Sequence, residues 1–139
     1  MPAHWEHFHH MADIGVRGYG TTLAEAFEQV ALGMMAVLTD VESIAPRTRI
    51  DIRCQAPDPE LLLVDWLNAL IYEMATRNMV FGRFSVSIAG PVLQGEAWGE
   101  TLQPHKHHPG VELKGATYTA LKVARLGDGS WLAQCVVDV

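Results

Sequence analysis

Two segments of the chain carry the hydrophobic period of an amphipathic helix. The first begins at a capping box, Thr22-Leu23-Ala24-Glu25, and we expect it to run to about Leu38. The second begins at Asp58-Pro59-Glu60, where an N-cap precedes a first-turn proline, and we expect it over about 59–76. Its apolar stripe is wide, which predicts a central helix lying against a sheet.

Alternation of polar and apolar positions predicts the strands. A short strand is expected at 14–19 and a strand with one wet face at 47–54. Four more follow at 80–89, 92–101, 115–124 and 130–137, the last two joined by a hairpin signal at 126–129. This order predicts an α+β fold for the single domain 1–139, with a mixed β-sheet of about six strands packed against two α-helices.

The composition fits one compact domain. The chain has 139 residues, of which 49% are hydrophobic and 19% charged, unlike a disordered protein. It shows neither a secretory leader nor an apolar run of about 20 residues, so we expect a soluble, cytoplasmic protein with no membrane partner. The net charge of -6 argues against strong direct nucleic-acid binding and favours a protein partner or a small local site.

Several residues receive a structural interpretation. Cys54 and Cys135 lie in alternating segments and are expected to be buried, reduced thiols. Asp65 and Asn68 interrupt the apolar second helix, and we interpret both as surface positions on its outer face. No Ser, His and Asp set indicates nucleophilic catalysis.

Two motifs leave weaker alternatives open. Glycines at 15–20 (GVRGYG) could indicate a nucleotide-binding turn, but the third glycine of that fingerprint is absent, so a tight turn explains them better. A zinc site could form from two histidine clusters, although neither has helical i, i+4 spacing and both are expected to be solvated. The first cluster lies before any expected regular structure; together the clusters comprise His7, His9, His10, His105, His107 and His108.

Carboxylates at the two ends of the chain are the stronger candidates for a site. Asp13 enters the first expected strand, and Asp138 ends the last one beside the terminal carboxylate of Val139. If these strands are neighbours, their acidic oxygens converge and need a cation or a shared proton. Oxygen-only ligation suits Ca²⁺, Mg²⁺ or Mn²⁺. Acidic residues at strand ends are also commonly just solvated. A further acid, Asp40, follows the first expected helix, where the partial negative charge of the terminal carbonyls makes an acidic residue locally unfavourable.

Several segments together resemble the archease family over nearly the whole chain. The most specific are residues 10–15 (HMADIG) and 62–68 (LLVDWLN). The others are residues 22–27 (TLAEAF), 38–40 (LTD), 70–72 (LIY), 99–100 (GE), His108, 112–118 (ELKGATY) and 136–139 (VVDV).

The resemblance implies a small α+β fold and a role as cofactor protein for an RtcB-type RNA ligase. That ligase joins 2′,3′-cyclic-phosphate (or 3′-phosphate) and 5′-hydroxyl ends in tRNA splicing and RNA repair. Archeases speed guanylylation of its active-site histidine and support repeated turnover without being enzymes themselves. The family's divalent-metal site, with calcium expected and magnesium or manganese as alternatives, maps onto Asp13, Asp138 and Val139. Beside that site, or facing the partner, we expect Asp40, His108 and Lys114.

The chain departs from the family pattern at Met11, where Thr is usual, at Thr119, where His is common, and at Gly115, where Ala is usual. None of these changes removes an expected metal ligand. Two rival functions remain. A metal-dependent hydrolase would use the same carboxylates with His108 and would act alone. A chaperone-like binding module would tolerate trimming of the terminal residues.

Overall fold

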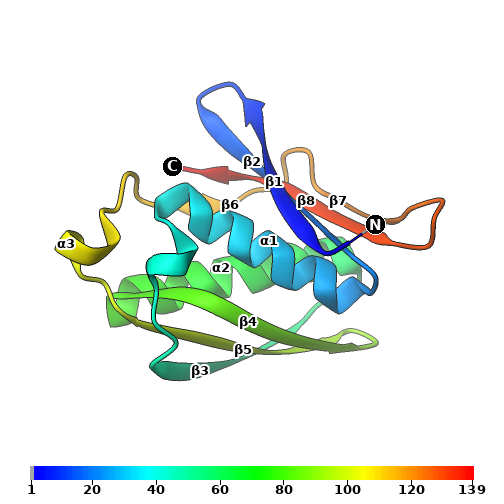
Figure 1. Ribbon diagram of the computed structural model, residues 1–139. Coiled ribbons are helices and arrows are strands. Elements are labelled where there is room, and N and C mark those ends of the chain that lie inside the picture. Colours follow the sequence, from blue (N-terminus) through cyan, green and yellow to red (C-terminus); the bar gives the residue numbers. More distant parts are fainter. Residues whose placement is uncertain (1) are drawn as a thin grey trace.

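The computed structural model describes residues 2–139. Its two long helices, α1 (Leu23–Leu38) and α2 (Pro59–Arg77), lie between two β-sheets (Figure 1). A one-turn helix, α3 (Pro104–His107), and a 3-10 turn, η1 (Val41–Ser43), lie near the C-terminal end of α1. Among the described residues, no helix combines the length and the apolar character needed to cross a membrane.

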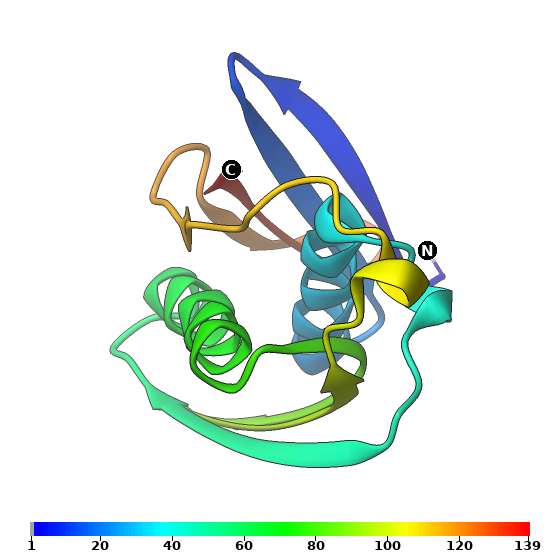
Figure 2. The same cartoon turned by 90° about the vertical axis from the view of Figure 1, so that its left-hand side faces the viewer.

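The larger sheet has five strands and contains both ends of the chain. Its order is β1-β2-β8-β6, with β7 also pairing with β8. The smaller sheet has the order β3-β5-β4, and Figure 2 shows it curving around α2. The strands of the larger sheet are β1 (His4–His10), β2 (Asp13–Gly20), β6 (Gly115–Ala116), β7 (Lys122–Arg125) and β8 (Trp131–Asp138); those of the smaller are β3 (Thr48–Gln55), β4 (Met79–Ala89) and β5 (Val92–Thr101).

The α+β class and the two principal helices are confirmed, but the single mixed sheet is wrong. Two sheets are present, and every strand pairing within residues 2–139 is antiparallel. Alternation along a strand reports that one of its faces is buried, but it does not report which sheet the strand joins. Helix α1 packs on β2 of one sheet and on β4 of the other, so both sheets cover the same helical layer.

The helix starts follow from local sequence. The Thr22 hydroxyl accepts the Glu25 N–H at 3.1 Å, and the Glu25 carboxylate reaches back to the Thr21 N–H at 2.7 Å. Asp58 accepts the Leu61 N–H at 2.9 Å at the start of α2. Side-chain acceptors of this kind satisfy amide groups that the first helical turn leaves without partners.

The core lies in the helical layer and joins both sheets. Trp66 of α2 is fully buried and donates its indole N–H to the Phe27 carbonyl of α1 at 3.2 Å. Its ring also occupies the space beside Gly95 of β5, where a Cβ atom would lie 2.4 Å from the ring. The wide apolar stripe of α2 therefore contacts the other helix and a sheet together, as the sequence predicts.

The histidine-rich start of the chain is a strand, contrary to the expectation that it precedes regular structure. Strand β1 pairs with β2 from His4–Tyr19 to His10–Asp13, and Met11 turns the chain with φ 52°. Trp5 and His7 lie against Gly33 of α1, and the polar His7 donates its Nε2–H to the Gly33 carbonyl at 2.7 Å. A histidine in this helix-facing position hides the hydrophobic alternation that would have predicted the strand.

The expected strand 115–124 is interrupted. Within this stretch, ladder pairing with β8 is limited to Gly115–Ala116 (β6) and Lys122–Arg125 (β7). Residues 117–121 form an irregular segment that stays hydrogen-bonded to Val136 of β8 through the backbone of Thr117 and Thr119. Ala120 has φ 53° within this segment. The predicted hairpin joining β7 to β8 is confirmed, with Gly129 at φ 88° and the Ser130 N–H donating to Asp128 at 2.9 Å.

Candidate functional site

The two carboxylates predicted to converge lie at the same end of neighbouring strands. Strands β2 and β8 are antiparallel, and Ile14 is paired with Val137. Asp13 precedes Ile14 and Asp138 follows Val137, so each lies one position beyond that pair. Residues opposite each other in such a ladder project from the same face, with Cβ atoms about 5 Å apart. The condition for their convergence, that the first and last expected strands be neighbours, is met by this pairing.

A cross-strand row of residues continues on both sides of these two. His10 of β1 is paired with Asp13, and Gly115 of β6 is paired with Asp138. The alternate residues of β2 and β8, such as Val16 and Val137, project from the opposite face of the sheet and are fully buried against the helices. Strand alternation therefore places the row on the face that points away from the helices. Asp13 and Asp138 are both half-buried.

Asn68 fixes the strand beside Asp138, a role that the sequence interpretation missed. Its side-chain Oδ1 accepts the Ala116 N–H at 2.8 Å, and its Nδ2 donates to the Ala116 carbonyl at 3.4 Å. The interpretation of Asn68 as an outer-face residue is therefore wrong, whereas Asp65 is exposed as expected. Directly before this strand, the Lys114 N–H donates to the Asp138 carbonyl at 2.9 Å. Lys114 thus lies beside the paired carboxylates, with its side chain exposed.

The donor set at this end is made of hard oxygens, which fit a divalent cation such as calcium. Within residues 2–139, no three His, Cys, Asp or Glu side chains are arranged to hold a metal ion. A cation shared by Asp13 and Asp138 would therefore need further oxygen ligands, and backbone carbonyls, the Val139 carboxylate and water are oxygen ligands of the kind that calcium accepts. Ca–O distances of about 2.3–2.6 Å are compatible with two carboxylates on adjacent strands.

Asp40 lies at the start of η1, just beyond the end of α1. Its carboxylate accepts the Glu42 N–H at 3.0 Å and thereby caps η1. This cap explains why an acidic residue stands just after the C-terminal end of α1, where the helix dipole disfavours negative charge. Its side chain is exposed. Both Ser43 groups, the backbone N–H at 3.0 Å and the hydroxyl at 2.6 Å, donate to the Asp40 carbonyl. The residue is thus a cap of a tight turn that also presents a free carboxylate oxygen to solvent.

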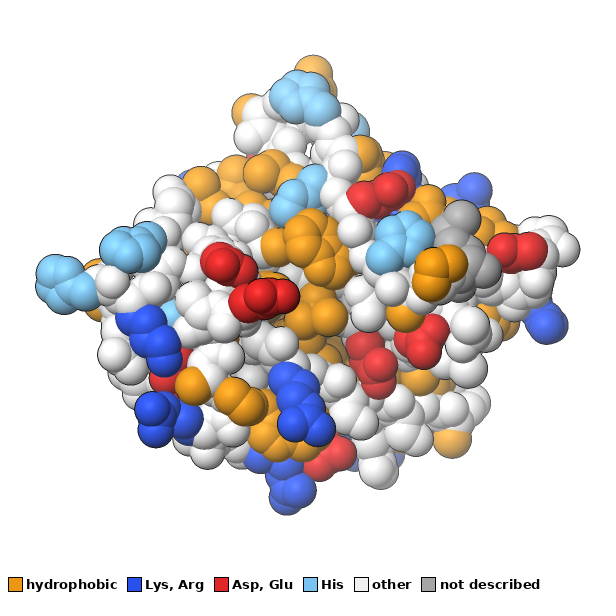
Figure 3. Space-filling model, in the orientation of Figure 1, with side chains coloured by type: hydrophobic (Ala, Val, Ile, Leu, Met, Phe, Trp, Pro, Cys, Tyr) orange, Lys and Arg blue, Asp and Glu red, His pale blue; other side chains and the backbone are white. Residues whose placement is uncertain are grey.

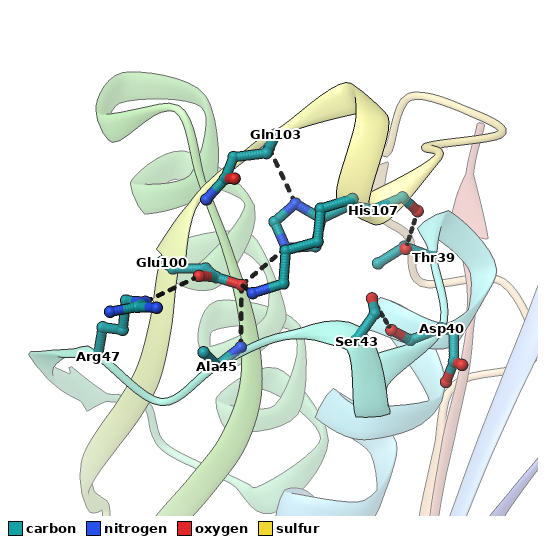
Figure 4. Close-up of polar contacts among 9 residues, drawn as sticks. Thr39, Asp40, Ser43, Ala45, Arg47, Glu100, Gln103 and His107 are labelled. Atoms are coloured by element: carbon teal, nitrogen blue, oxygen red, sulfur yellow. Dashed lines mark hydrogen bonds and ion pairs between the residues drawn. The ribbon is translucent and has the colours of Figure 1, made fainter.

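Behind this turn lies a buried carboxylate that the sequence analysis did not single out as a candidate (Figure 4). Glu100, near the end of β5, is 3% exposed. It accepts hydrogen bonds from the Ala45 N–H at 2.9 Å and from His107 Nε2 at 2.9 Å. Lys106 and Arg47 complete the set, with nitrogen–oxygen distances of 2.7 Å and 3.3 Å. The Ala45 amide, then Lys106 and His107, lower the pKa of Glu100 to about 2.

His107 is fixed in one tautomer by its partners. The Gln103 N–H donates to its Nδ1 at 2.9 Å, so Nδ1 is unprotonated and Nε2 carries the proton that it shares with Glu100. The His107 carbonyl accepts a hydrogen bond from the Thr39 hydroxyl. Neither ring nitrogen is therefore available to a metal, and His107 is a structural residue.

The other histidines do not assemble a zinc site. His7 is bonded to Gly33, and His108 is an exposed residue with φ 48° that ends α3. Figure 3 shows histidine side chains spread between the end of the β1–β2 hairpin and the α3 side of the molecule. The alternative of a shared histidine cluster thus has no support in the described part of the chain.

The glycines of the GVRGYG stretch serve close packing. A Cβ atom at Gly18 would lie 2.5 Å from the Val30 backbone nitrogen, and one at Gly20 would lie 2.6 Å from the Ala26 nitrogen. Both positions let β2 approach α1 more closely than any side chain allows. The cysteines are buried as predicted, and burial raises the pKa of Cys54 to about 11 and that of Cys135 to about 12.

Comparisons with known proteins identify the family of this chain. The family model described as the archease protein family matches residues 5–139. Protein archease of Pyrococcus furiosus is 45% identical, with 97% of this chain and 98% of that protein covered. Protein archease of Thermococcus kodakarensis is 43% identical over the same shares.

Two solved structures share the fold. The solution structure of Methanobacterium thermoautotrophicum protein 1598 has a TM-score of 0.85 and 31% identity, and the match covers 97% of this chain and 98% of that one. The crystal structure of an archease from Thermotoga maritima, described as a possible chaperone, has a TM-score of 0.62 and 21% identity, with 95% and 94% covered. From the matched family model and these relatives, the chain belongs to the archease family.

Proposed function

We propose that this protein is a non-catalytic cofactor of an RtcB-type RNA ligase. It would speed guanylylation of the ligase and sustain its repeated turnover in tRNA splicing and RNA repair. The proposal is supported by membership of the archease family and by the shared end of β2 and β8. The observation that carries it is the placement of Asp13 and Asp138 on one face, one position beyond the Ile14–Val137 pair.

We further propose that Asp13, Asp138 and Val139 hold a divalent cation, with calcium fitting best and magnesium or manganese as alternatives. The donors are oxygens throughout, the ligand type that these cations take. When bound, such a cation supplies positive charge that stabilises phosphate oxygens during nucleotide transfer. The chain's own part is to present the two carboxylates from neighbouring strands and to hold β6 beside them through Asn68.

The partner-facing residues lie around this end of the molecule. The C-terminus, the end of α1 and the segment leading from α3 to β6 face the viewer in Figure 2. Asp40 and Lys114 are exposed on these elements, and His108 is exposed at the end of α3. Lys114 is tied through its backbone to Asp138 at 2.9 Å, whereas Asp40 is tied to the α3 segment through Thr39. We assign Asp40, Lys114 and His108 to contact with the ligase.

The partner is a protein rather than free RNA. The chain carries 16 acidic and 10 basic residues, and phosphate binding rests on clusters of Lys and Arg. Among the described residues, five of those basic side chains form ion pairs with carboxylates of the chain itself: Arg17, Arg47, Arg49, Arg77 and Lys106. We place the protein in the cytoplasm, with RNA reaching it only through the ligase.

The direct test is the rate of ligase guanylylation with GTP, measured with and without this protein. Wild type should accelerate the reaction, and Asp13→Asn and Asp138→Asn should each remove most of the acceleration. Asp65→Asn, an exposed change elsewhere on α2, is the matched control and should act as wild type. Equal acceleration by all four proteins would overturn the proposal, and so would hydrolytic turnover by the isolated protein.

A binding module is the second candidate function, in line with the Thermotoga maritima archease, which is described as a possible chaperone. Such a module would act through surface contacts alone. It would then keep its effect when Asp13 and Asp138 are neutralised, so the same four proteins distinguish the two functions.

A further inference from the structure

The Asp40 turn is attached to the rest of the molecule at both of its ends. Before the turn, the Thr39 hydroxyl donates to the His107 carbonyl. After the turn, the Ala45 N–H donates to the Glu100 carboxylate at 2.9 Å. Thr39 is 7% exposed, so the first of these bonds is shielded from water. Hydrogen bonds on either side of Asp40 thus restrain the backbone that carries its exposed carboxylate.

Both attachments lead to the same buried pair. Glu100 and His107 are joined directly at 2.9 Å, and both are nearly inaccessible to solvent, with 3% and 2% exposed. The path from Thr39 through His107 and Glu100 to Ala45 closes a ring of contacts around η1, which Figure 4 shows. Because the ring is closed, the turn cannot shift without breaking one of the bonds to this pair.

We propose that Glu100 and His107 are positioning residues that hold the Asp40 carboxylate in place for its contact with the ligase. The inference rests on the proposed function, in which Asp40 faces the partner. Neither Glu100 nor His107 touches the partner in this account, because both are buried and their polar atoms are already engaged.

A stable fold does not by itself require an ionised carboxylate at this position. Replacing a buried ionic group by apolar residues of similar size is often neutral or stabilising, because burying the charge costs desolvation energy. An ionised carboxylate accepts strong hydrogen bonds from several donors at once, and these bonds fix the positions of the donors relative to one another. Here one donor is the Ala45 amide, which follows the turn. Another is the ring of His107 in α3, whose carbonyl accepts the hydrogen bond from Thr39 before the turn.

The Asp40 turn is also held by hydrogen bonds of its own. The Asp40 carbonyl accepts two hydrogen bonds from Ser43, and one carboxylate oxygen accepts the Glu42 N–H. Those bonds shape the turn internally, whereas the contacts to His107 and Glu100 set where the whole turn lies. A partner that recognises the free Asp40 carboxylate oxygen would therefore bind more tightly, because the contacts to His107 and Glu100 hold the turn in place before binding.

The test uses three near-isosteric variants and one control. Thr39→Val removes the hydroxyl donor, Glu100→Gln removes the charge, and Asp40→Asn removes the proposed contact. Val86→Ala removes a buried side chain of β4 that is 9% exposed and serves as a stability control. Each protein is titrated into the guanylylation reaction, which gives a half-maximal concentration and a maximal rate.

Thr39→Val, Glu100→Gln and Asp40→Asn should each raise the half-maximal concentration, on the order of tenfold, with the maximal rate unchanged. The double variant Glu100→Gln with Asp40→Asn should be no weaker than Asp40→Asn alone, because residues that act through one contact are not additive. Val86→Ala should lower the melting temperature and leave both kinetic parameters unchanged. Additive losses in the double variant would overturn the proposal.

A second measurement separates this inference from the proposed function. Hydrogen exchange of the Ser43 and Ile44 amides, which are bonded inside the turn, should be about tenfold faster in Thr39→Val and Glu100→Gln than in wild type. Unchanged exchange would overturn the positioning role whatever the ligase does. If wild type fails to accelerate guanylylation while exchange changes as expected, the restraint on the turn stands and the proposed function, together with the ligase contact of Asp40, is lost.

Discussion

Asp13 and Asp138 come from opposite ends of the sequence and project from the same face of the five-stranded sheet, each one residue beyond the Ile14–Val137 pair. A cation shared by two ionised carboxylates on such neighbouring positions would remove the repulsion between them. Strand β6 borders Asp138 on its other side. This relationship is the basis of the proposed cation site.

Removing the Asn68 side chain should destabilise the protein by about 2 kcal/mol, because Asn68→Ala leaves the half-buried Ala116 N–H without its partner. Urea unfolding followed by circular dichroism measures the change. Asp65→Ala, at an exposed position of the same helix, should shift the free energy of unfolding by less than about 0.5 kcal/mol. Equal effects of the two substitutions would contradict the role given to Asn68.

Gly18→Ala should destabilise the protein by about 3 kcal/mol, because the added Cβ atom would lie 2.5 Å from the Val30 backbone nitrogen. Gly127→Ala is the matched control, since a Cβ atom there meets nothing within 4 Å. Thermal unfolding of the two variants checks the prediction. If both melt like wild type, close packing does not explain this glycine.

The contribution of Glu100 to stability should depend on pH. Its pKa is about 2 in the folded protein against an ordinary value of 4.5, so as the pH falls through this interval the unfolded chain takes up a proton that the folded protein does not. The stabilisation is therefore present above about pH 4.5 and is lost as the pH falls toward 2. The difference in melting temperature between wild type and Glu100→Gln should shrink between pH 6 and pH 3. A constant difference over that range would show that the charge of Glu100 contributes nothing.

The cysteines should be unreactive in the native state. Burial raises the pKa of Cys54 to about 11 and of Cys135 to about 12, and the thiolate is the reactive form. Labelling by a disulfide reagent at pH 8 should be more than about a hundredfold slower for the native protein than in 6 M guanidinium chloride, where both thiols are exposed. Rapid stoichiometric labelling of the native protein would contradict the burial of both residues.

Features encoded by neighbouring residues were predictable from the sequence. The capping side chains Thr22 and Asp58 act within a few residues of themselves, and both helices begin where expected. The sequence predicts that Asp13 and Asp138 converge only if their strands are neighbours. The pairing of β2 with β8 meets that condition. The count of sheets was not predictable, because alternation does not assign a strand to a sheet.

The residues that the sequence interpretation missed all depend on distant partners. Asn68 is 48 positions from the backbone group that it holds, and Glu100 is 55 positions from Ala45. The available signal for Asn68 was a polar residue within an apolar helix. A polar residue on the solvent-facing side of a helix gives the same sequence pattern, so the signal does not distinguish the two. For His107, the polar loop around it suggested solvation, whereas the fold buries its ring against Glu100.

Calcium titration by isothermal calorimetry tests the central claim most directly, comparing wild type with Asp13→Asn, Asp138→Asn and the Asp65→Asn control. We predict one site per wild-type chain and a loss of affinity of at least about tenfold in each of the first two variants, because each removes a charged oxygen ligand. The double variant should bind no calcium, and Asp65→Asn should bind as wild type. Wild-type affinity in Asp13→Asn or in Asp138→Asn would contradict a cation shared between the two ends of the chain.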